Sequence, residues 1–271
     1  MQNDGNGSRL PFSVSAELEI AMKSETEAII INSMNLGDAD KLVTFLSTER
    51  GIQKGIAKNA RKSFRRFGAG LESFTVCRLL VHGWEHQELL RIESADIMVQ
   101  HPAICADLKR AAAGSVMLEL VKELVPSGEG NPETFYLLSY LLQLLNAGED
   151  PLVLLRIFEI KLLSLLGYQP KLDHCLSCGK SPNAEALFLG MKGGVLCRNC
   201  MVSSGGQHIL VSQGTVGFYY QTLRMELGKL SRLKPSASII TELGQVFSAH
   251  LFHILGKQLR SVEFLRSVYP F

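Results

Sequence analysis

Four of the six cysteines form two pairs with the same spacing, and this pattern constrains the fold more than any other feature. The pairs are Cys175-x2-Cys178 and Cys197-x2-Cys200, and eighteen residues separate them. Two residues between thiols let one turn present both sulfurs to a single ion at about 2.3 Å, and two such turns complete a tetrahedral site. The pattern predicts a zinc knuckle within residues 171–206, inserted between helical segments.

Four thiolates fill the coordination shell of zinc and leave no position for water, so the site is expected to be structural. Apparent binding free energies of such sites reach roughly 10–16 kcal/mol, and loss of one thiol should unfold the segment. A pair of redox motifs, or a knuckle that has lost its metal, are the alternatives. The remaining cysteines, Cys77 and Cys105, are predicted to be buried thiols with a packing role.

Composition limits the class of protein. The chain has 271 residues, of which 46% are hydrophobic and 20% charged, which excludes a disordered chain. Six cysteines are too sparse for a disulfide scaffold. The apolar stretches are too short, or too interrupted by charge, to cross a bilayer, and no secretion signal is apparent. We therefore expect a cytoplasmic protein without a membrane partner.

The first third of the chain has the pattern of a small β-barrel. Residues 1–23 show little periodicity and are predicted to be a flexible leader. Between residues 24 and 100, apolar and β-branched runs alternate with turn residues, and one long basic loop interrupts them. Five short strands in this arrangement suit an OB-fold barrel, although another small barrel remains open. The predicted strands cover residues 27–33, 41–46, 52–57, 74–81 and 88–99.

From residue 101 to 271 the period becomes helical, so the fold class is α+β: an OB-fold barrel followed by an α-helical domain with an inserted zinc knuckle. Asn131 and Asp150 are predicted N-caps, each followed by proline at the first helical position. The third helix is apolar almost all round and is expected at the centre of the helical core. The predicted helices cover residues 103–125, 132–147, 151–166, 212–227 and 236–255.

A basic run in the predicted barrel, KGIAKNARKSFRR, predicts nucleic-acid binding. It contains no acid, Phe64 lies within it and Phe67 directly follows it. Cations follow a phosphate backbone, while aromatic rings stack on bases without regard to sequence. Because the net charge is only +2, a nucleic-acid role must depend on this local patch. The alternative is a solvated loop whose phenylalanines belong to the core. The predicted DNA-binding residues are Lys54, Lys58, Arg61, Lys62, Arg65 and Arg66.

No catalytic signature is found. His86-x-Glu88 together with Cys175-x2-Cys178 resembles a zinc deaminase, but no proline precedes Cys175 and a second cysteine pair closes the site. A P-loop, GxSxG and HExxH are all absent from the sequence. The chain is therefore predicted to be a non-enzyme without a small-molecule substrate.

The order of these features resembles the RecO family of bacterial DNA repair and recombination mediators. No single motif is decisive, but their order and spacing are specific and extend from about residue 24 to 267. The matching segments are 26–30 (TEAII), 36–44 (LGDADKLVT), 51–61 (GIQKGIAKNAR), 70–74 (GLESF), 158–163 (FEIKLL), 166–170 (LGYQP), 193–197 (GGVLC) and 259–265 (LRSVEFL).

The resemblance implies binding to single- and double-stranded DNA and annealing of complementary strands without ATP hydrolysis. Together with RecR, such a protein helps to load the RecA recombinase on single strands coated by single-strand-binding protein. It implies a nucleoid-associated location in the cytoplasm and docking of the acidic, hydrophobic tail of single-strand-binding protein on the helical domain. Arg156 and Lys161 are the predicted contacts for that tail.

Two other functions remain open at this point. A zinc-ribbon adaptor in transcription would bind a protein partner through the knuckle and need no annealing activity. A zinc-dependent nucleic-acid enzyme would require a water molecule on the metal.

Overall fold

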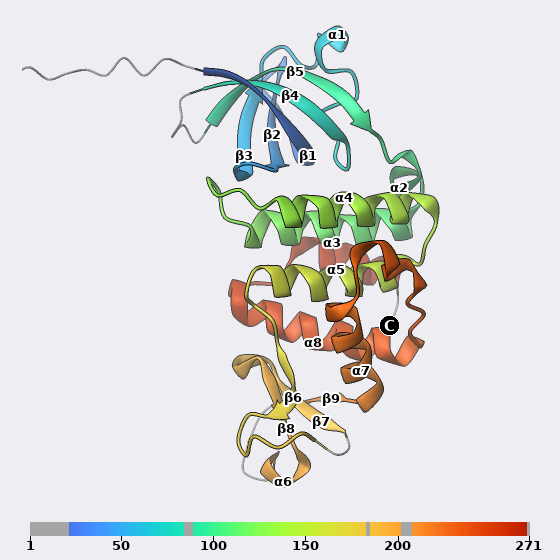
Figure 1. Cartoon of the computed structure of the whole chain (residues 1–271). Helices are drawn as coiled ribbons and strands as arrows, with labels where there is room; N and C mark the ends of the chain where they lie inside the picture. Colours follow the sequence, from blue (N-terminus) through green and yellow to red (C-terminus); the bar gives the residue numbers. More distant parts are fainter. Residues whose placement is uncertain (1–21, 84–88, 183–184, 202–207, 270–271) are drawn as a thin grey trace, which may run out of the picture.

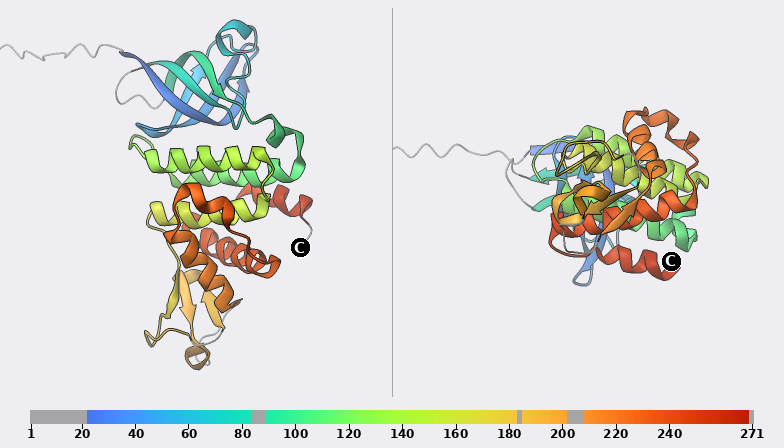
Figure 2. Two further views of the ribbon diagram at one scale, coloured as in Figure 1. Left: turned by 45° about the vertical axis from the view of Figure 1, so that its right-hand side comes forward. Right: turned by 90° about the horizontal axis from the view of Figure 1, so that it is seen from below.

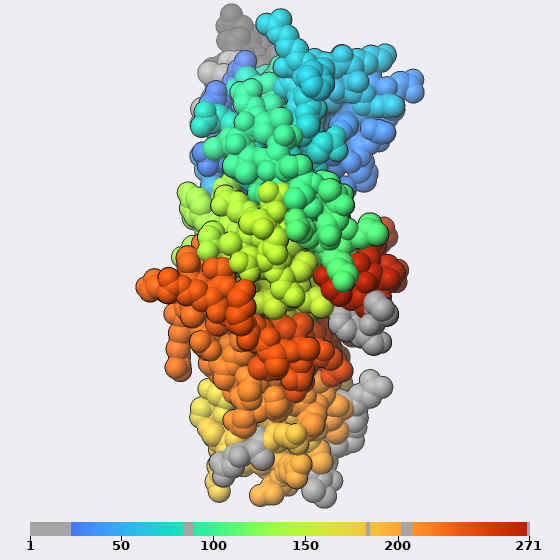
Figure 3. Space-filling model, turned by 90° about the vertical axis from the view of Figure 1, so that its right-hand side faces the viewer, coloured from blue at the N-terminus to red at the C-terminus, as the bar shows by residue number. Residues whose placement is uncertain are grey.

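A computed structural model describes residues 22–83, 89–182, 185–201 and 208–269. The predicted leader lies outside these ranges except for its last two residues, which begin the first strand. The molecule is elongated, with a β-barrel at one end, helices in the middle and a small cysteine-containing sheet at the other end (Figure 1, Figure 2). The space-filling view shows the same three tiers (Figure 3).

The first tier is a closed barrel of five strands in the order β1-β2-β3-β5-β4. Strands β3 and β5 pair in parallel and all other neighbours are antiparallel. This arrangement confirms the predicted OB-type barrel. The strands are β1 (Met22–Leu36), β2 (Asp40–Ser47), β3 (Gly51–Ala57), β4 (Val76–Gly83) and β5 (Leu89–Val99), and the short helix α1 (Phe64–Phe67) lies between β3 and β4.

Strand β1 joins the barrel to the helices because its side chains alternate between two cores. Ala28 and Ile30 lie in the barrel core, whereas Ile29 and Ile31 belong to the helical core. Successive side chains of a strand point to opposite faces, so a run of consecutive apolar residues packs on both sides. The run AIII is therefore one part of the contact between the two tiers, and Leu46, Ile52 and Val76 of the neighbouring strands join the same helical core.

The prediction of one continuous helix over residues 103–125 is wrong. The segment forms two helices, α2 (Pro102–Ala106) and α3 (Leu108–Leu124). The break occurs because Asp107 has an extended backbone and its carboxylate accepts a hydrogen bond from the Arg110 N–H at 2.9 Å. It is thus the N-cap of α3.

Helix α4 (Pro132–Ala147) has the predicted bounds, and its predicted N-cap, Asn131, accepts a hydrogen bond from the Thr134 N–H at 3.0 Å. Helix α5 (Pro151–Leu165) ends one residue earlier than predicted and carries the predicted cap, Asp150. Most of its side chains are buried and it contacts α3, α4, α7 and α8, which confirms its central place.

The last helices are α7 (Gln213–Arg224), the 3-10 segment η2 (Leu227–Arg232), α8 (Ala237–Leu255) and α9 (Arg260–Val268). Helix α9 was not predicted. It packs on α3, and the Glu119 carboxylate accepts hydrogen bonds from the first backbone N–H groups of α9, Arg260 at 3.0 Å and Ser261 at 2.7 Å. Among the described helices, none combines the length and the apolar character that a membrane span requires.

The third tier is a four-stranded sheet in the order β6-β8-β7-β9, and its strands were not predicted. Its elements are β6 (Lys171–Cys175), β7 (Ala186–Leu189), η1 (Gly190–Lys192), β8 (Gly194–Leu196), α6 (Arg198–Met201) and β9 (Ile209–Val211).

Of the two cysteines outside the four-cysteine cluster, Cys77 is buried in the barrel as predicted. The prediction for Cys105 is wrong, because its side chain is exposed. Its neighbour Ile104 is the residue of α2 that enters the helical core.

The barrel rests on the α3–α4 connection through close backbone contacts. Gly51, with φ +60°, forms an isolated β-bridge with Ser127, and the Ile52 N–H donates to the Pro126 carbonyl at 3.3 Å. A Cβ atom on Gly51 would overlap the Pro126 carbonyl oxygen and lie 2.7 Å from that of Glu129. Only glycine combines this φ with so close an approach.

We predict that Gly51→Ala lowers the free energy of unfolding by about 2 kcal/mol or more, because the added methyl overpacks the junction between barrel and helices. Gly37→Ala is the matched control, since Gly37 has φ +61° but a methyl group added there would have no neighbouring atom within 4 Å. This control should lower the free energy of unfolding by about 1 kcal/mol, which is the cost of the left-handed backbone alone. Equal losses in urea denaturation of the two variants would contradict this account of the junction.

Candidate nucleic-acid interface and metal centre

The predicted DNA-binding residues lie on β3 and on the segment that leads from it into α1. Helix α1 stands at the end of the barrel that faces away from the helices (Figure 1). Lys54 is exposed on the wall of the barrel, and Arg66 is half-buried. Four further cations are exposed along the segment: Lys58, Arg61, Lys62 and Arg65.

Hydrogen bonds to the β1–β2 turn hold this basic segment in place. The Arg61 N–H donates to the Ala39 carbonyl at 3.0 Å, and the Arg61 guanidinium donates to the Asp38 carbonyl at 3.1 Å. The Asn59 N–H donates to the Asp40 carboxylate at 2.8 Å, with Asn59 at φ +57°. Arg61 therefore has a structural role in addition to its charge.

Arg66 is the second cation that holds the segment. Its guanidinium donates to the Lys58 carbonyl at 2.7 Å and to the Ser63 hydroxyl at 3.0 Å, and it lies 4.8 Å from the centre of the Phe67 ring. Phe67 itself is buried in the barrel core. The aromatic residues therefore divide: Phe67 belongs to the core, whereas Phe64 is exposed.

The other four cations of the basic run are available to a ligand. Within the described residues, the side chains of Lys54, Lys58, Lys62 and Arg65 make no hydrogen bond or ion pair. Because no carboxylate among the described residues pairs with them, their positive charge is directed toward the solvent.

Strand register also brings together basic residues that the sequence did not indicate. Lys23 on β1 pairs with His82 on β4, and His82 pairs with Arg91 on β5, so the three side chains share one outer row of the barrel. Lys23 and Arg91 are exposed, and Arg91 forms a 2.8 Å ion pair with Glu93. These residues are scattered along the chain, so only the strand register could have revealed them.

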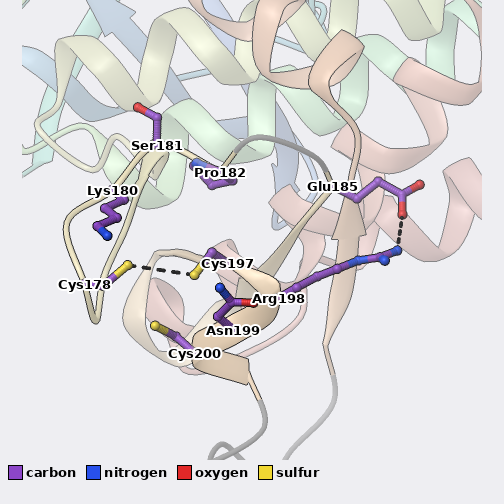
Figure 4. Close-up of a pocket in the computed structure, with 9 residues that line it drawn as sticks. All are labelled: Cys178, Lys180, Ser181, Pro182, Glu185, Cys197, Arg198, Asn199 and Cys200. Carbon is purple, nitrogen blue, oxygen red and sulfur yellow. Dashed lines mark hydrogen bonds and ion pairs between the residues drawn. The ribbon is translucent and has the colours of Figure 1, made fainter.

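The four paired cysteines meet at the far end of the molecule, as their spacing predicts. Their sulfur atoms all lie within 4.8 Å of one another, and the Cys178 and Cys197 sulfurs are 3.8 Å apart. Figure 4 shows three of the four: Cys178, Cys197 and Cys200. Tetrahedral coordination with metal–sulfur bonds of about 2.3 Å places sulfurs about 3.8 Å apart. The cluster is thus of the right size and chemistry to hold one metal ion.

Backbone hydrogen bonds at the first knuckle favour the thiolate of Cys175. Burial opposes ionisation of the Cys175 thiol, but backbone hydrogen bonds from Cys197, Cys178 and Ser177 prevail and lower its pKa to about 6. A hydrogen bond with the Cys197 thiol raises the pKa of Cys200 to about 12. The four thiols cannot all ionise in such proximity unless a cation balances their charge.

Arg156 and Lys161, the predicted contacts of a partner tail, lie on α5 in different environments. The Lys161 ammonium donates to the Leu223 and Met225 carbonyls at 3.0 and 2.7 Å, at the C-terminal end of α7. Burial lowers the pKa of Lys161. Lys161 therefore anchors α7 to α5.

Arg156 is buried and forms a 2.8 Å ion pair with Glu159. Burial raises the pKa of Glu159 to about 7, and the nearby Arg156 opposes that rise. Both side chains line a groove of about 650 Å³, to which α8 contributes Gly244 and α9 contributes Arg266. The groove thus combines a mostly apolar lining with buried charge.

The family models and the similar proteins all belong to one family. The Recombination protein O N-terminal family matches residues 22–100, and its C-terminal family matches residues 105–263. Similar proteins include "DNA repair protein RecO" of Syntrophus aciditrophicus, 32% identical, and that of Desulforamulus reducens, 33% identical. Each comparison covers 90% of this chain, with 95% and 94% of the relative. The Geobacter sulfurreducens protein of the same name is 34% identical over 90% of this chain and 98% of its own.

Proposed function

The chain belongs to the RecO family of DNA repair proteins, and we propose that it anneals complementary DNA strands and helps to load RecA recombinase on single strands coated by single-strand-binding protein. The observation that carries the annealing role is a set of exposed cations, on β3 and on the segment that leads into α1, whose side chains form no hydrogen bond or ion pair with the described part of the chain. Lys54, Lys58, Lys62 and Arg65 make the direct phosphate contacts in this proposal, and Arg61 and Arg66 add charge while they hold the segment.

The proposed mechanism is electrostatic. Two single strands repel each other through their phosphates, and a cluster of cations lowers that repulsion by displacing counterions from both. Base pairing then provides specificity, so the protein needs no contact that distinguishes one base from another. Neither ATP hydrolysis nor a catalytic residue is required, and the protein acts as a binding surface.

We predict that replacing Lys58, Lys62 and Arg65 together by alanine lowers affinity for single-stranded DNA and slows annealing. If all three contact phosphates, the slope of log affinity against log salt becomes shallower by about 2. A salt titration of binding to short oligonucleotides, with annealing followed by fluorescence energy transfer and without nucleotide, measures both effects.

The matched control removes three exposed cations from outside the barrel instead: Lys192, Arg232 and Arg260. This variant has the same net charge as the test variant and should keep the wild-type slope. If the two triple variants behave alike, net charge and not the basic segment accounts for binding.

We propose that the four-cysteine cluster binds structural Zn²⁺, because four thiolates suit this ion and leave no open position. Cys178→Ser should abolish stoichiometric zinc and increase amide hydrogen exchange in residues 171–201 and 208–211. Cys105→Ser is the control, since this thiol is also exposed but lies outside the cluster. Metal analysis and hydrogen exchange give the readouts, and full zinc content in Cys178→Ser would refute the proposed ligand set.

We further propose that RecR is a partner and that the groove beside Arg156 receives the acidic tail of single-strand-binding protein. An apolar tail residue would occupy the groove while a carboxylate meets Arg156, the one of the two predicted contacts that lines it. Lys161 contributes by holding α7 in place.

The tail proposal predicts that Gly244→Val weakens binding of a fluorescent peptide copying that tail by about tenfold or more, as expected for loss of a hydrogen bond to a charged group. A Cβ at Gly244 lies 3.4 Å from an Arg156 guanidinium nitrogen, so the valine covers this charge without removing it. Gly217→Val places the same change in α7, where no atom lies within 4 Å. Equal affinities for the two variants in fluorescence anisotropy would exclude Arg156 as the contact.

A further inference from the structure

Phe64 is the most exposed large hydrophobic residue among those that the structure describes, with 86% of its surface accessible. Phe67, three residues later on the same short helix, is 2% exposed and fills the barrel core. Phenylalanine is usually buried, and this barrel buries one of the two. Packing within the chain therefore explains Phe67 and leaves Phe64 without a structural role.

Hydrogen bonds within α1 and to the preceding segment order the backbone that carries Phe64. The Gly68 N–H donates to the Phe64 carbonyl at 2.7 Å, which closes α1. Arg66 ties the helix to the Lys58 carbonyl and covers the buried Phe67 ring. Because this backbone is already ordered, covering the ring costs mainly the rotamer freedom of one side chain.

The charges around Phe64 indicate which ligand suits it. Exposed Lys62 and Arg65 lie close to it in the sequence, and the basic run from Lys54 to Arg66 contains no acid. An exposed aromatic ring with cations on both sides suits a ligand that combines a planar group with negative charge. It suits an uncharged apolar ligand less well. A nucleotide base attached to its phosphate backbone has this chemistry.

We propose that Phe64 stacks on an unpaired base of single-stranded DNA and thereby makes the protein prefer single strands over duplex. This inference rests on the proposed function, since it assumes that the neighbouring cations contact phosphates. In a duplex, both faces of a base are already covered by its neighbours, so only an unpaired base offers a free face. Once two strands have paired, the ring loses its partner and the product is released more easily.

Phe64→Ala tests the proposal with two probes: an ordinary single strand and an abasic strand that has phosphates and sugars but no bases. Stacking of one base is expected to account for about 5- to 100-fold in affinity. Phe64→Ala should lose this factor on the ordinary strand, while affinity for the abasic strand and for duplex stays at the wild-type value. The salt slope should also be unchanged, because no cation has been removed.

Three further variants make the result specific to the ring. Phe64→Leu keeps an apolar side chain without a π-face and should bind as weakly as Phe64→Ala. Phe64→Trp should keep the wild-type affinity, because tryptophan also has a π-face. Trp84 is the only tryptophan of the sequence, so in a Trp84→Phe background the new indole is the only one. Its fluorescence should be quenched by ordinary strands but not by abasic strands. Met191→Ala is the control for loss of an exposed apolar side chain, since Met191 is 83% exposed and lies in the cysteine-containing tier.

The outcomes separate this inference from the proposed function. If Phe64→Ala binds ordinary strands as well as wild type, while the triple cation variant loses affinity and slope, the stacking role is refuted and the annealing role stands. Loss of duplex affinity to the same extent would show insertion between paired bases, and full affinity of Phe64→Leu would show a simple apolar contact; either result overturns stacking. If the wild-type protein binds no single strand, the proposed function itself fails.

Discussion

The structure depends on the alternation of strand β1 between two hydrophobic cores. Ala28 and Ile30 pack in the core of the barrel, and Ile29 and Ile31 pack against the helices. A barrel that hung from the helices by a flexible linker would move independently of them. Because β1 belongs to both cores, as do β2 and β4, the barrel is fixed on the helices at one end, and α1 lies at the other end.

Sequence reasoning succeeded where local chemistry decides the structure. Alternating strands, the Asn131 and Asp150 caps and the spaced cysteine pairs depend on neighbours within a few residues, and the structure confirms these features. It failed where a distant partner decides. The N-terminus of α9 is capped by Glu119, some 140 positions away, and no local pattern signals that contact.

The candidate site shows the same division at the level of single side chains. The sequence indicated six cations and two phenylalanines, yet it offered no means of separating those that hold the segment from those that face a ligand. Arg61 and Arg66 bond to backbone carbonyls, whereas Lys58, Lys62 and Arg65 do not. That distinction arises from the fold of the segment against the β1–β2 turn, because carbonyl positions depend on backbone conformation and not on composition.

In the proposed interface, cations contact phosphates and Phe64 contacts an unpaired base. These two kinds of contact together allow annealing to be both strong and reversible. Phosphate contacts hold paired and unpaired strands alike, so an interface of cations alone would retain its duplex product. A contact to bases distinguishes the two states, because pairing removes the free face that stacking requires. The combination of exposed cations with one exposed ring on an ordered backbone therefore suits a protein that must bind single strands and then give up the duplex they form.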